Sequence, residues 1–549
     1  MTTKKNLNVP ASWRAAAFPG APLATTALFV AALLAGCDVA NRHVRRADTA
    51  VEQADLDVDL PKIQEKLDRI TGAKRTLNEV TLLHLGRASR PERIRLIEGA
   101  KRTVFQTVPY WFDDEEGRFF RDLIKDKRDR TPGLDVRILL DWSSPGSTGD
   151  LFGTKMFASL KEATGGNALL WNEPQWKRRF SGDLLRNRMH EKLLVVDGTQ
   201  LVMGGMNVAD DYLQGGVTRK GWHDTDILVE GPAAAEAQKV FLKLWEVSRY
   251  LASSAPFPAF QKEEAEVLQR LFYEDDGRFK IVPLGEKKAV DAEIPFRKYL
   301  SDPFYFPPLP LRPEWDVPLR LIYDNTLVDR NPRTGRQVSK IMDTLTYLVR
   351  MSQKSILLFV PYLTPHEDFI DELVAAAKKG KPVVIVTNSE RSHDIGTIPW
   401  KAGTSHYKKL LDAGVYIFEW QGHADLLDLE KANGCTVPVG SWPGRTIHSK
   451  VAVVDGNVCL VGSHNFNVRS ESFNDEVAAL FQSREVARQL GKVFVDDLDL
   501  DEAKRTVPCG AGLLRRPRRV QQILPADADR FMQEHGGTAA FLSGLQTYM

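Results

Sequence analysis

The sequence has little of several features that mark particular classes of protein. Its four cysteines and eleven histidines form no spacing typical of a zinc site. The formal net charge is only +2, so any attraction to nucleic acid or anionic lipid depends on local patches, such as the four arginines within residues 515–519. Hydrophobic residues make up 43% and charged residues 27%, which argues against a disordered chain or a protein with many membrane spans. Most of the chain is therefore expected to fold in water.

The N-terminus also lacks a hydrophobic run long enough to cross a membrane comfortably. Basic residues precede an apolar stretch from Ala21 to Leu34, which is typical of a secretory signal. The stretch ends in Leu34-Ala35-Gly36-Cys37, which resembles the bacterial lipobox, where the cysteine is lipidated; the alternative is a cysteine that follows the apolar run by chance. We expect residues 1–37 to be a lipoprotein signal peptide, with Cys37 as the lipidation site.

This anchor predicts a location in the bacterial cell envelope, on the periplasmic side. In a host with the enterobacterial sorting system, Asp38 directly after the cysteine resembles the signal for retention at the inner membrane. The three remaining cysteines are an odd number in an oxidising compartment. Cys459 lies in an apolar strand pattern and is predicted to be a core residue, whereas a disulfide between Cys435 and Cys509 stays open.

The most informative feature that is present is an internal repeat. His190-Glu-Lys-Leu-Leu-Val-Val-Asp-Gly198 recurs as His448-Ser-Lys-Val-Ala-Val-Val-Asp-Gly456. Seven residues after its aspartate, each copy continues with a Gly-x-x-Asn sequence, at 204–207 and at 462–465. Upstream, Val-Pro-Tyr occurs at 108–110 and again at 360–362. The matched spacings indicate that the chain is a duplication.

Both copies alternate short apolar runs, such as residues 136–140, with periodic helical stretches, such as 234–245. This alternation predicts an α/β fold with two homologous lobes, each a mostly buried mixed sheet flanked by helices. Packing about a pseudo-twofold axis would bring the two motifs to one site. The expected segments are a polar helical spacer (38–78), the first lobe (79–255), a linker (256–318), the second lobe (319–500) and a C-terminal extension (501–549).

The linker is rich in proline and aromatic residues, most densely in Phe304-Tyr-Phe-Pro-Pro-Leu-Pro310. This proline density excludes a continuous helix or a central strand. The favoured interpretation is a segment that packs across both lobes. The alternative is an interfacial loop whose aromatic rings lie at the level of lipid headgroups.

The residue types of the repeated motif suit phosphodiester chemistry. In an extended strand, residues i and i+2 point to the same face, so His190 and Lys192 project together, as do His448 and Lys450. One neutral histidine can attack phosphorus and form a phosphohistidine, while the other, protonated, gives a proton to the leaving alkoxide and then activates the acceptor. The lysines neutralise charge on the equatorial oxygens. The chemistry requires no metal and no other cofactor.

A single histidine on an apolar strand is more often structural than catalytic, so the case for catalysis rests on the second copy and on the residues around both. Asn207, Asn465 and Ser463 are the candidate phosphate-binding residues. Each histidine also needs a carboxylate to fix its tautomer, and the strand after each motif offers one, Asp224 in the first copy and Glu476 in the second.

Asp197 and Asp455 complete the two motifs and are counted with the catalytic set. Each lies seven residues beyond its histidine, faces the opposite side of the strand and precedes a glycine. This position predicts that each aspartate caps a turn.

These residues resemble the phospholipase D superfamily, whose members have two H-x-K-x4-D motifs and two α/β lobes around one site. The resemblance covers most of residues 79–500. Within the superfamily the flanking residues are similar to those of bacterial cardiolipin synthases, notably 204–212, 222–225 and 229–232 after the first motif and 462–470 and 473–477 after the second. The resemblance implies that His190 is the nucleophile and His448 the acid and base. Asn467 and Val468 stand where these synthases usually have Asp-Pro, a departure in the turn.

The first hypothesis is therefore transfer of a phosphatidyl group between phospholipids, with the membrane as partner through the lipid anchor. The alternative is a phosphodiesterase that uses water, either a phospholipase D or a nuclease; the low net charge argues against nucleic acid as a partner. A third hypothesis, a lipid-binding scaffold with a degenerate site, is disfavoured because both motifs are complete. Nothing in the sequence specifies an oligomeric state.

Overall fold

The computed structural model describes residues 56–531 except 143–153, 172–186, 219–220, 254–310, 326–328, 330–337, 395–396, 438–443 and 499–504, together with residues 533–534. Cys37, the expected signal peptide and the aromatic stretch at 304–310 lie outside the described residues. Among the helices that are described, none is long and apolar enough to cross a membrane.

Seven strands of the first lobe form a mixed sheet in the spatial order β4-β3-β2-β6-β7-β8-β1. Their bounds are β1 (Thr76–His84), β2 (Thr103–Val108), β3 (Asp135–Asp141), β4 (Ala168–Trp171), β6 (Leu193–Val196), β7 (Gln200–Gly204) and β8 (Thr225–Glu230). β2, β3 and β4 run parallel, and the remaining neighbours are antiparallel. Every residue of β2 and β6 is buried: β6 is wholly apolar, whereas β2 also buries Thr103, Gln106 and Thr107.

The second lobe repeats this order as β12-β11-β10-β13-β14-β15-β9. Its strands are β9 (Glu314–Asp324), β10 (Ile356–Val360), β11 (Val383–Asn388), β12 (Tyr416–Trp420), β13 (Val451–Val454), β14 (Val458–Gly462) and β15 (Asn474–Gln482). β18 (Val520–Ile523) adds an antiparallel strand beside β12. The identical order confirms the two-lobed α/β fold that the repeat predicts.

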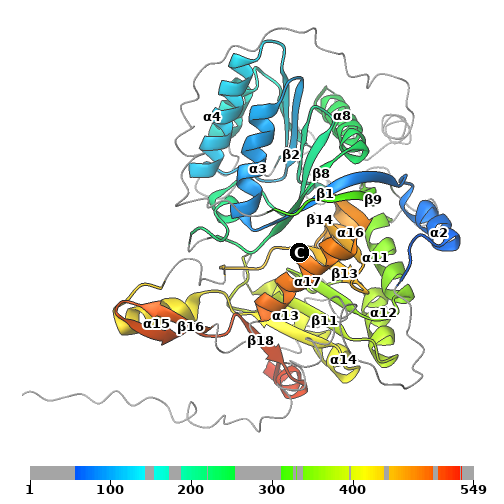
Figure 1. Ribbon diagram of the computed structural model, residues 1–549, viewed down its shortest axis with the longest axis vertical. Coiled ribbons are helices and arrows are strands. Elements are labelled where there is room, and N and C mark those ends of the chain that lie inside the picture. Colours follow the sequence, from blue (N-terminus) through cyan, green and yellow to red (C-terminus); the bar gives the residue numbers. More distant parts are fainter. Residues whose placement is uncertain are drawn as a thin grey trace, which may run out of the picture.

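The two sheets are continuous, because β1 and β9 pair antiparallel with Thr76 opposite Leu319. The strand order is symmetric about this pair, so the approximate twofold axis passes between β1 and β9 (Figure 1). A short strand, β5 (Arg188–Met189), leaves the first lobe and pairs with β15 of the second. The lobes are therefore joined by backbone hydrogen bonds as well as by side chains.

Helices cover both faces of the sheet. One face carries a helix from each lobe, α8 (Pro232–Ser253) and α17 (Arg484–Leu498), in a single core that spans the lobe boundary. Phe105 of β2 stacks on Phe241 of α8 with ring centroids 4.8 Å apart, and Phe359 of β10 stacks on Phe494 of α17 at 3.9 Å. The repeated stacking shows the duplication in the core packing itself.

The other face is covered by separate sets of helices in the two lobes. The first lobe has α3 (Gly86–Gly99), α4 (Glu115–Arg130), α5 (Thr154–Ala163) and the short α7 (Asp210–Leu213). The second lobe has α11 (Lys340–Met351), α12 (Glu367–Lys378), α13 (Ile398–Thr404), α14 (Tyr407–Asp412) and α16 (Val468–Phe473). Helix α15 (Ala424–Asn433) lies apart from this core, in a small separate cluster with Val507.

The described part of the expected spacer contacts the second lobe. Helix α2 (Pro61–Thr71) lies against α11, and Leu56, Ile63 and Leu67 belong to the core of that lobe. A proline in its first turn and Gly72 in the left-handed conformation after its last residue define the ends of α2. Residues 56–71 thus lie on the second lobe, and the chain then enters β1 of the first.

The structure contains the disulfide that the sequence left open. Cys435, just after α15, is bonded to Cys509, and the two Cα atoms lie 5.4 Å apart. Cys509 ends β16 (Thr506–Cys509), which forms a hairpin with β17 (Gly512–Arg515). Figure 1 shows this hairpin and α15 projecting from the second lobe. Cys459 is buried in β14, as its sequence context predicts.

In each lobe, the motif aspartate binds the backbone just before a strand. Asp197 and Asp455 both adopt left-handed backbone conformations, with φ of 54° and 55°. The carboxylate of Asp197 accepts hydrogen bonds from the backbone N–H groups of residues 101–103, just before β2. Asp455 does the same for residues 353–355, just before β10, and also accepts from Leu56. Their role is to brace the sheet.

We expect Asp455→Asn to lower the free energy of unfolding by about 2–4 kcal/mol, because an amide offers one acceptor oxygen to four backbone donors. Turnover per folded molecule should stay close to that of the unmodified chain. Chemical denaturation and a rate measurement check the two parts. Asp412→Asn, at an exposed position paired only with Lys408, is the matched control. Loss of turnover without loss of stability would instead give Asp455 a direct part in the chemistry.

Candidate active site

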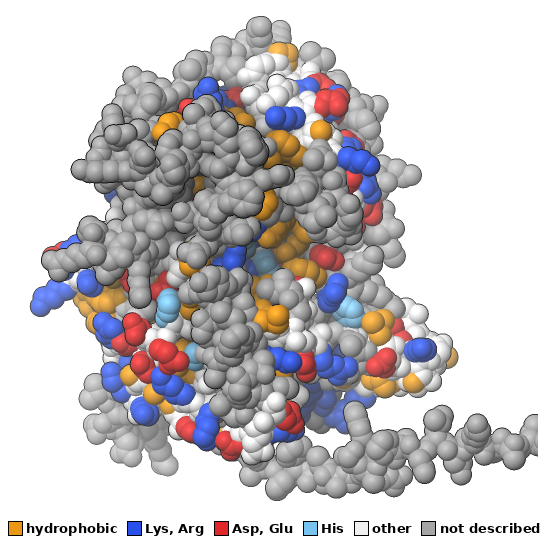
Figure 2. All heavy atoms as spheres, turned by 180° about the vertical axis from the view of Figure 1, so that it is seen from behind, with side chains coloured by type: hydrophobic (Ala, Val, Ile, Leu, Met, Phe, Trp, Pro, Cys, Tyr) orange, Lys and Arg blue, Asp and Glu red, His pale blue; other side chains and the backbone are white. Residues whose placement is uncertain are grey.

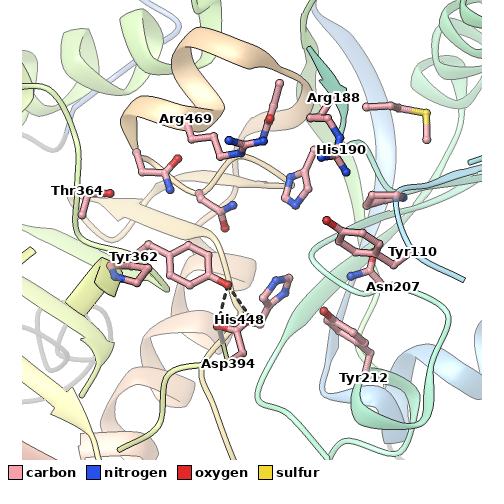
Figure 3. Close-up of a pocket in the computed structure, with 16 residues that line it drawn as sticks. Tyr110, Arg188, His190, Asn207, Tyr212, Tyr362, Thr364, Asp394, His448 and Arg469 are labelled. Atoms are coloured by element: carbon pink, nitrogen blue, oxygen red, sulfur yellow. Dashed lines mark hydrogen bonds between the residues drawn. The ribbon is translucent and has the colours of Figure 1, made fainter. Parts of the chain in front are cut away.

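A cavity of about 390 Å³ lies between the two lobes. The first lobe contributes Pro109, Tyr110, Arg188, Met189, His190, Asn207 and Tyr212. The second lobe contributes Tyr362, Thr364, Asp394, Pro399, His448, Asn465, Asn467, Arg469 and Asn474. Figure 3 shows the two motif histidines on opposite sides of this cavity. The single shared site that the duplication predicts is therefore present.

Backbone hydrogen bonds across the lobe boundary fix each histidine. The His190 N–H donates to the carbonyl of Asp475 (2.9 Å), and the His448 N–H donates to the carbonyl of His223 (2.7 Å). The sequence predicted that both histidines lie within an extended strand. In the structure they lie just before β6 and β13 instead. The main chain before each strand is thus bound to the other lobe, and this is what turns the imidazoles into the cavity.

The carboxylates that orient the histidines are exchanged between lobes. His190 Nδ1 lies 2.9 and 3.0 Å from the two carboxylate oxygens of Glu476, in the second lobe. His448 Nδ1 lies 2.7 Å from Asp224 Oδ2, in the first lobe. Both carboxylates were predicted, but each serves the histidine of the other copy. Because Nδ1 is occupied in this way, Nε2 is the nitrogen available to a substrate.

Glu476 is held by more than its histidine. Ser463 Oγ donates to one of its oxygens (2.5 Å) and Asn474 Nδ2 to the other (3.1 Å). Burial alone would raise the pKa of Glu476, but the charge and hydrogen bond of His190 outweigh burial and lower it to about 2. Ser463, predicted as a phosphate ligand, does not line the cavity and instead positions this carboxylate.

Burial favours the neutral form of both imidazoles. Burial lowers the pKa of His190 to about 4, against the opposing charge of Glu476. Burial and the nearby Lys450 hold the pKa of His448 well below its usual value. His448 also packs against the rings of Tyr212 and Trp222, with centroids 5.1 and 5.5 Å away. Neutral imidazole is the form that can act as a nucleophile.

The two motif lysines lie behind the histidines. Lys192 Nζ donates to the carbonyl of His190 (2.8 Å), and Lys450 Nζ donates to that of His448. Both side chains are buried, and neither lines the cavity. Burial lowers the pKa of Lys192 to about 8 and of Lys450 to about 7, although nearby carboxylates oppose this effect. The lysines can act on a phosphate mainly through their charge, which is weakly screened in a buried site.

Asn207 and Asn465 line the cavity in equivalent positions of the two lobes. The Oδ1 atom of each is buried and has no hydrogen-bond partner within the part of the chain that the structure describes. An asparagine amide can present either its oxygen or its NH2 group after rotation. Both residues therefore line the site as expected, and their role as phosphate ligands stays a prediction.

Several cavity residues were not identified from the sequence. The Val-Pro-Tyr repeats served only to detect the duplication, yet Tyr110 and Tyr362 both line the site. Tyr362 Oη donates to Asp394 (2.7 and 2.8 Å), on the His448 side of the cavity. Arg188 and Arg469 lie on the His190 side (Figure 3). The Tyr repeat was a usable signal, whereas Asp394 and the two arginines lie in segments where the copies differ.

Comparison with known proteins agrees with this geometry. The family described as "Cardiolipin synthase, PLD-like domain" matches residues 94–245 and 345–498, one range in each lobe. Cardiolipin synthase C of Escherichia coli K12 is 25% identical over 426 residues, which cover 73% of this chain and 81% of that protein. Cardiolipin synthase 2 of Bacillus cereus is 25% identical over 411 residues, covering 74% of this chain and 62% of that protein, less than two thirds of its length.

A solved structure shares the fold. Phosphatidylserine synthase from Haemophilus influenzae superposes with a TM-score of 0.54 over 88% of this chain and 99% of that one, at 13% identity. At this identity the likeness concerns the fold alone. Together, the two family matches and the shared fold confirm the resemblance that the paired motifs carried.

Because both histidines face one cavity, we expect His190→Ala and His448→Ala each to reduce turnover of a phosphodiester substrate by about 10²–10⁴-fold or more. Steady-state rates of the two variants and of the unmodified chain check this. His366→Ala, at a half-exposed position outside the cavity, serves as control. Retention of full activity by either motif variant would refute a shared site.

Proposed function

The chain belongs to the phospholipase D-like cardiolipin synthase family, and on that premise we propose that it is a phosphatidyltransferase that joins two phospholipids through a phosphohistidine. The observation that carries the proposal is the pair of imidazoles, one from each lobe, that face one cavity with a carboxylate behind each. The names of the relatives support phospholipid as the substrate class.

In the first step, Nε2 of His190 attacks the phosphorus of a donor such as phosphatidylglycerol. The bond between phosphorus and the headgroup oxygen breaks, and His448 gives the leaving alkoxide its proton. The phosphatidyl group is then bound to His190 and free glycerol departs. Glu476 stays ionised and stabilises the positive charge that develops on the His190 ring.

In the second step, a hydroxyl of the acceptor phospholipid gives its proton to His448, and its oxygen attacks phosphorus. The nitrogen–phosphorus bond breaks, which restores His190 and releases the product. His448 must carry a proton at the start of the reaction although its pKa is low. The negative charge of a bound phosphodiester raises that pKa, and Asp224 and Asp394 act in the same direction.

Hydrolysis is the alternative, because a phosphohistidine can be attacked by water as readily as by an alcohol. A nuclease of this kind would need a basic groove. On the face that Figure 2 shows, Lys and Arg side chains are interspersed with Asp and Glu, and hydrophobic side chains are visible between the two halves of the molecule. This distribution favours a lipid substrate over a nucleic acid.

We further propose that a lipid on Cys37 holds the enzyme at the periplasmic face of the inner membrane. The support for this part is the lipobox-like sequence and Asp38 alone, which both lie outside the described residues. A tether of this kind would keep the cavity close to its water-insoluble substrates.

The full chain, incubated with phosphatidylglycerol alone and with added phosphatidylethanolamine, should form cardiolipin, detected by mass spectrometry of the lipid products. His448→Ala, with the same anchor and fold, is the control and should form none. Phosphatidic acid as the sole product would overturn transfer in favour of hydrolysis. Cleavage of DNA that weakens steeply with salt would point to the nuclease instead.

A further inference from the structure

The two sides of the cavity carry opposite charge, although the histidines, lysines and asparagines are paired by the duplication. Four residues after the motif asparagine, the second lobe has Arg469 where the first has Asp211. Two residues before the motif histidine, the first lobe has Arg188 where the second has Thr446. Both guanidinium groups therefore lie on the His190 side (Figure 3).

The opposite side is acidic. Asp394 lines the cavity there and accepts the hydrogen bond of Tyr362 beside His448. An anion entering the cavity is thus attracted to one side and repelled from the other. The transferred phosphate must lie between the two histidines, next to the paired asparagines. The unequal charge of the two sides is therefore not needed to bind that phosphate, and we infer that it binds a second group.

The two arginines differ in how closely a carboxylate approaches them. Arg188 is neutralised by Asp141, with Nη2 2.7 Å from Oδ1. For Arg469, by contrast, the described residues provide no hydrogen bond and no ion pair. Burial and the charge of Arg188 lower the pKa of Arg469, and the more distant carboxylates of Asp141 and Glu476 only partly oppose this. A partly buried cation without an ion-pair partner is unfavourable unless a ligand supplies the opposite charge.

We propose that Arg469, assisted by Arg188, forms a second anion subsite that holds the phosphate of the acceptor phospholipid. This inference rests on the proposed function, in which the acceptor is itself a phosphodiester. The acceptor hydroxyl and the acceptor phosphate belong to the same glycerol, so fixing the phosphate beside His190 presents the hydroxyl to the phosphohistidine. Water and free glycerol lack this phosphate and gain nothing from Arg469.

The subsite is also expected to affect the two steps of the reaction differently. When phosphatidylglycerol is the donor, the leaving group is free glycerol, which carries no second phosphate. Arg469 should therefore contribute more to attack by the acceptor than to formation of the phosphohistidine. Its effect is expected in the KM for the acceptor rather than in the initial burst of glycerol release.

The test uses two small acceptors that differ by one phosphate, deuterated glycerol and deuterated glycerol 3-phosphate, with phosphatidylglycerol as donor. We expect Arg469→Gln to lower kcat/KM for glycerol 3-phosphate by about 10–100-fold more than it lowers kcat/KM for glycerol or the rate of the glycerol burst. Arg469→Lys should restore part of the loss. Arg118→Gln, at an exposed position paired with Asp113, is the control for the substitution itself.

Equal losses for both acceptors, or no loss for either, would overturn the subsite. If the enzyme transfers to no alcohol at all, the proposed function fails, and inhibition of hydrolysis by glycerol 3-phosphate then tests the subsite separately. In that case Arg469→Gln should raise the inhibition constant about 10–100-fold, and an unchanged constant would contradict the inference. Thermal unfolding of each variant identifies any loss that arises from misfolding.

Discussion

Each motif histidine of this protein is hydrogen-bonded to a carboxylate of the other lobe, and the rest of the structure holds the two lobes in the positions that these contacts require. Glu476 binds His190 and Asp224 binds His448, while backbone hydrogen bonds between the same segments fix the main chain. The continuous sheet through β1 and β9 and the core shared by α8 and α17 prevent the lobes from shifting. A small displacement between lobes would separate both pairs at once, so neither lobe has a complete site alone.

The duplication explains both what the sequence predicts and where prediction stops. The repeat was sufficient to predict the two lobes, the shared site, the histidines and the carboxylates, and the apolar run at 136–140 does form β3. It could not show which carboxylate serves which histidine, since two equivalent copies allow either pairing. The sequence also predicted Ser463 as a phosphate ligand, and the structure shows it bonded to Glu476 instead. That contact arises from the pairing of β14 with β15, which the repeat does not reveal.

The cavity contains residues that are paired by the duplication and residues that are not, and the two groups differ in their expected roles. The paired histidines, lysines and asparagines suit a phosphorus atom that is attacked from one side and released on the other. Arg469 and Asp394 break the symmetry and so give the cavity a direction, which a reaction between two different substrates needs. The motif aspartates, in contrast, remain symmetric and stay out of the cavity, bracing β2 and β10.

The phosphohistidine proposed for His190 can be trapped and located in the chain. Mixing the full chain with phosphatidylglycerol, quenching within a turnover in alkaline denaturant and mapping peptides by mass spectrometry would locate the phosphatidyl group. We expect at most one adduct per chain, on the peptide that contains His190. An adduct on His448, two adducts on one chain or turnover with no adduct would contradict it.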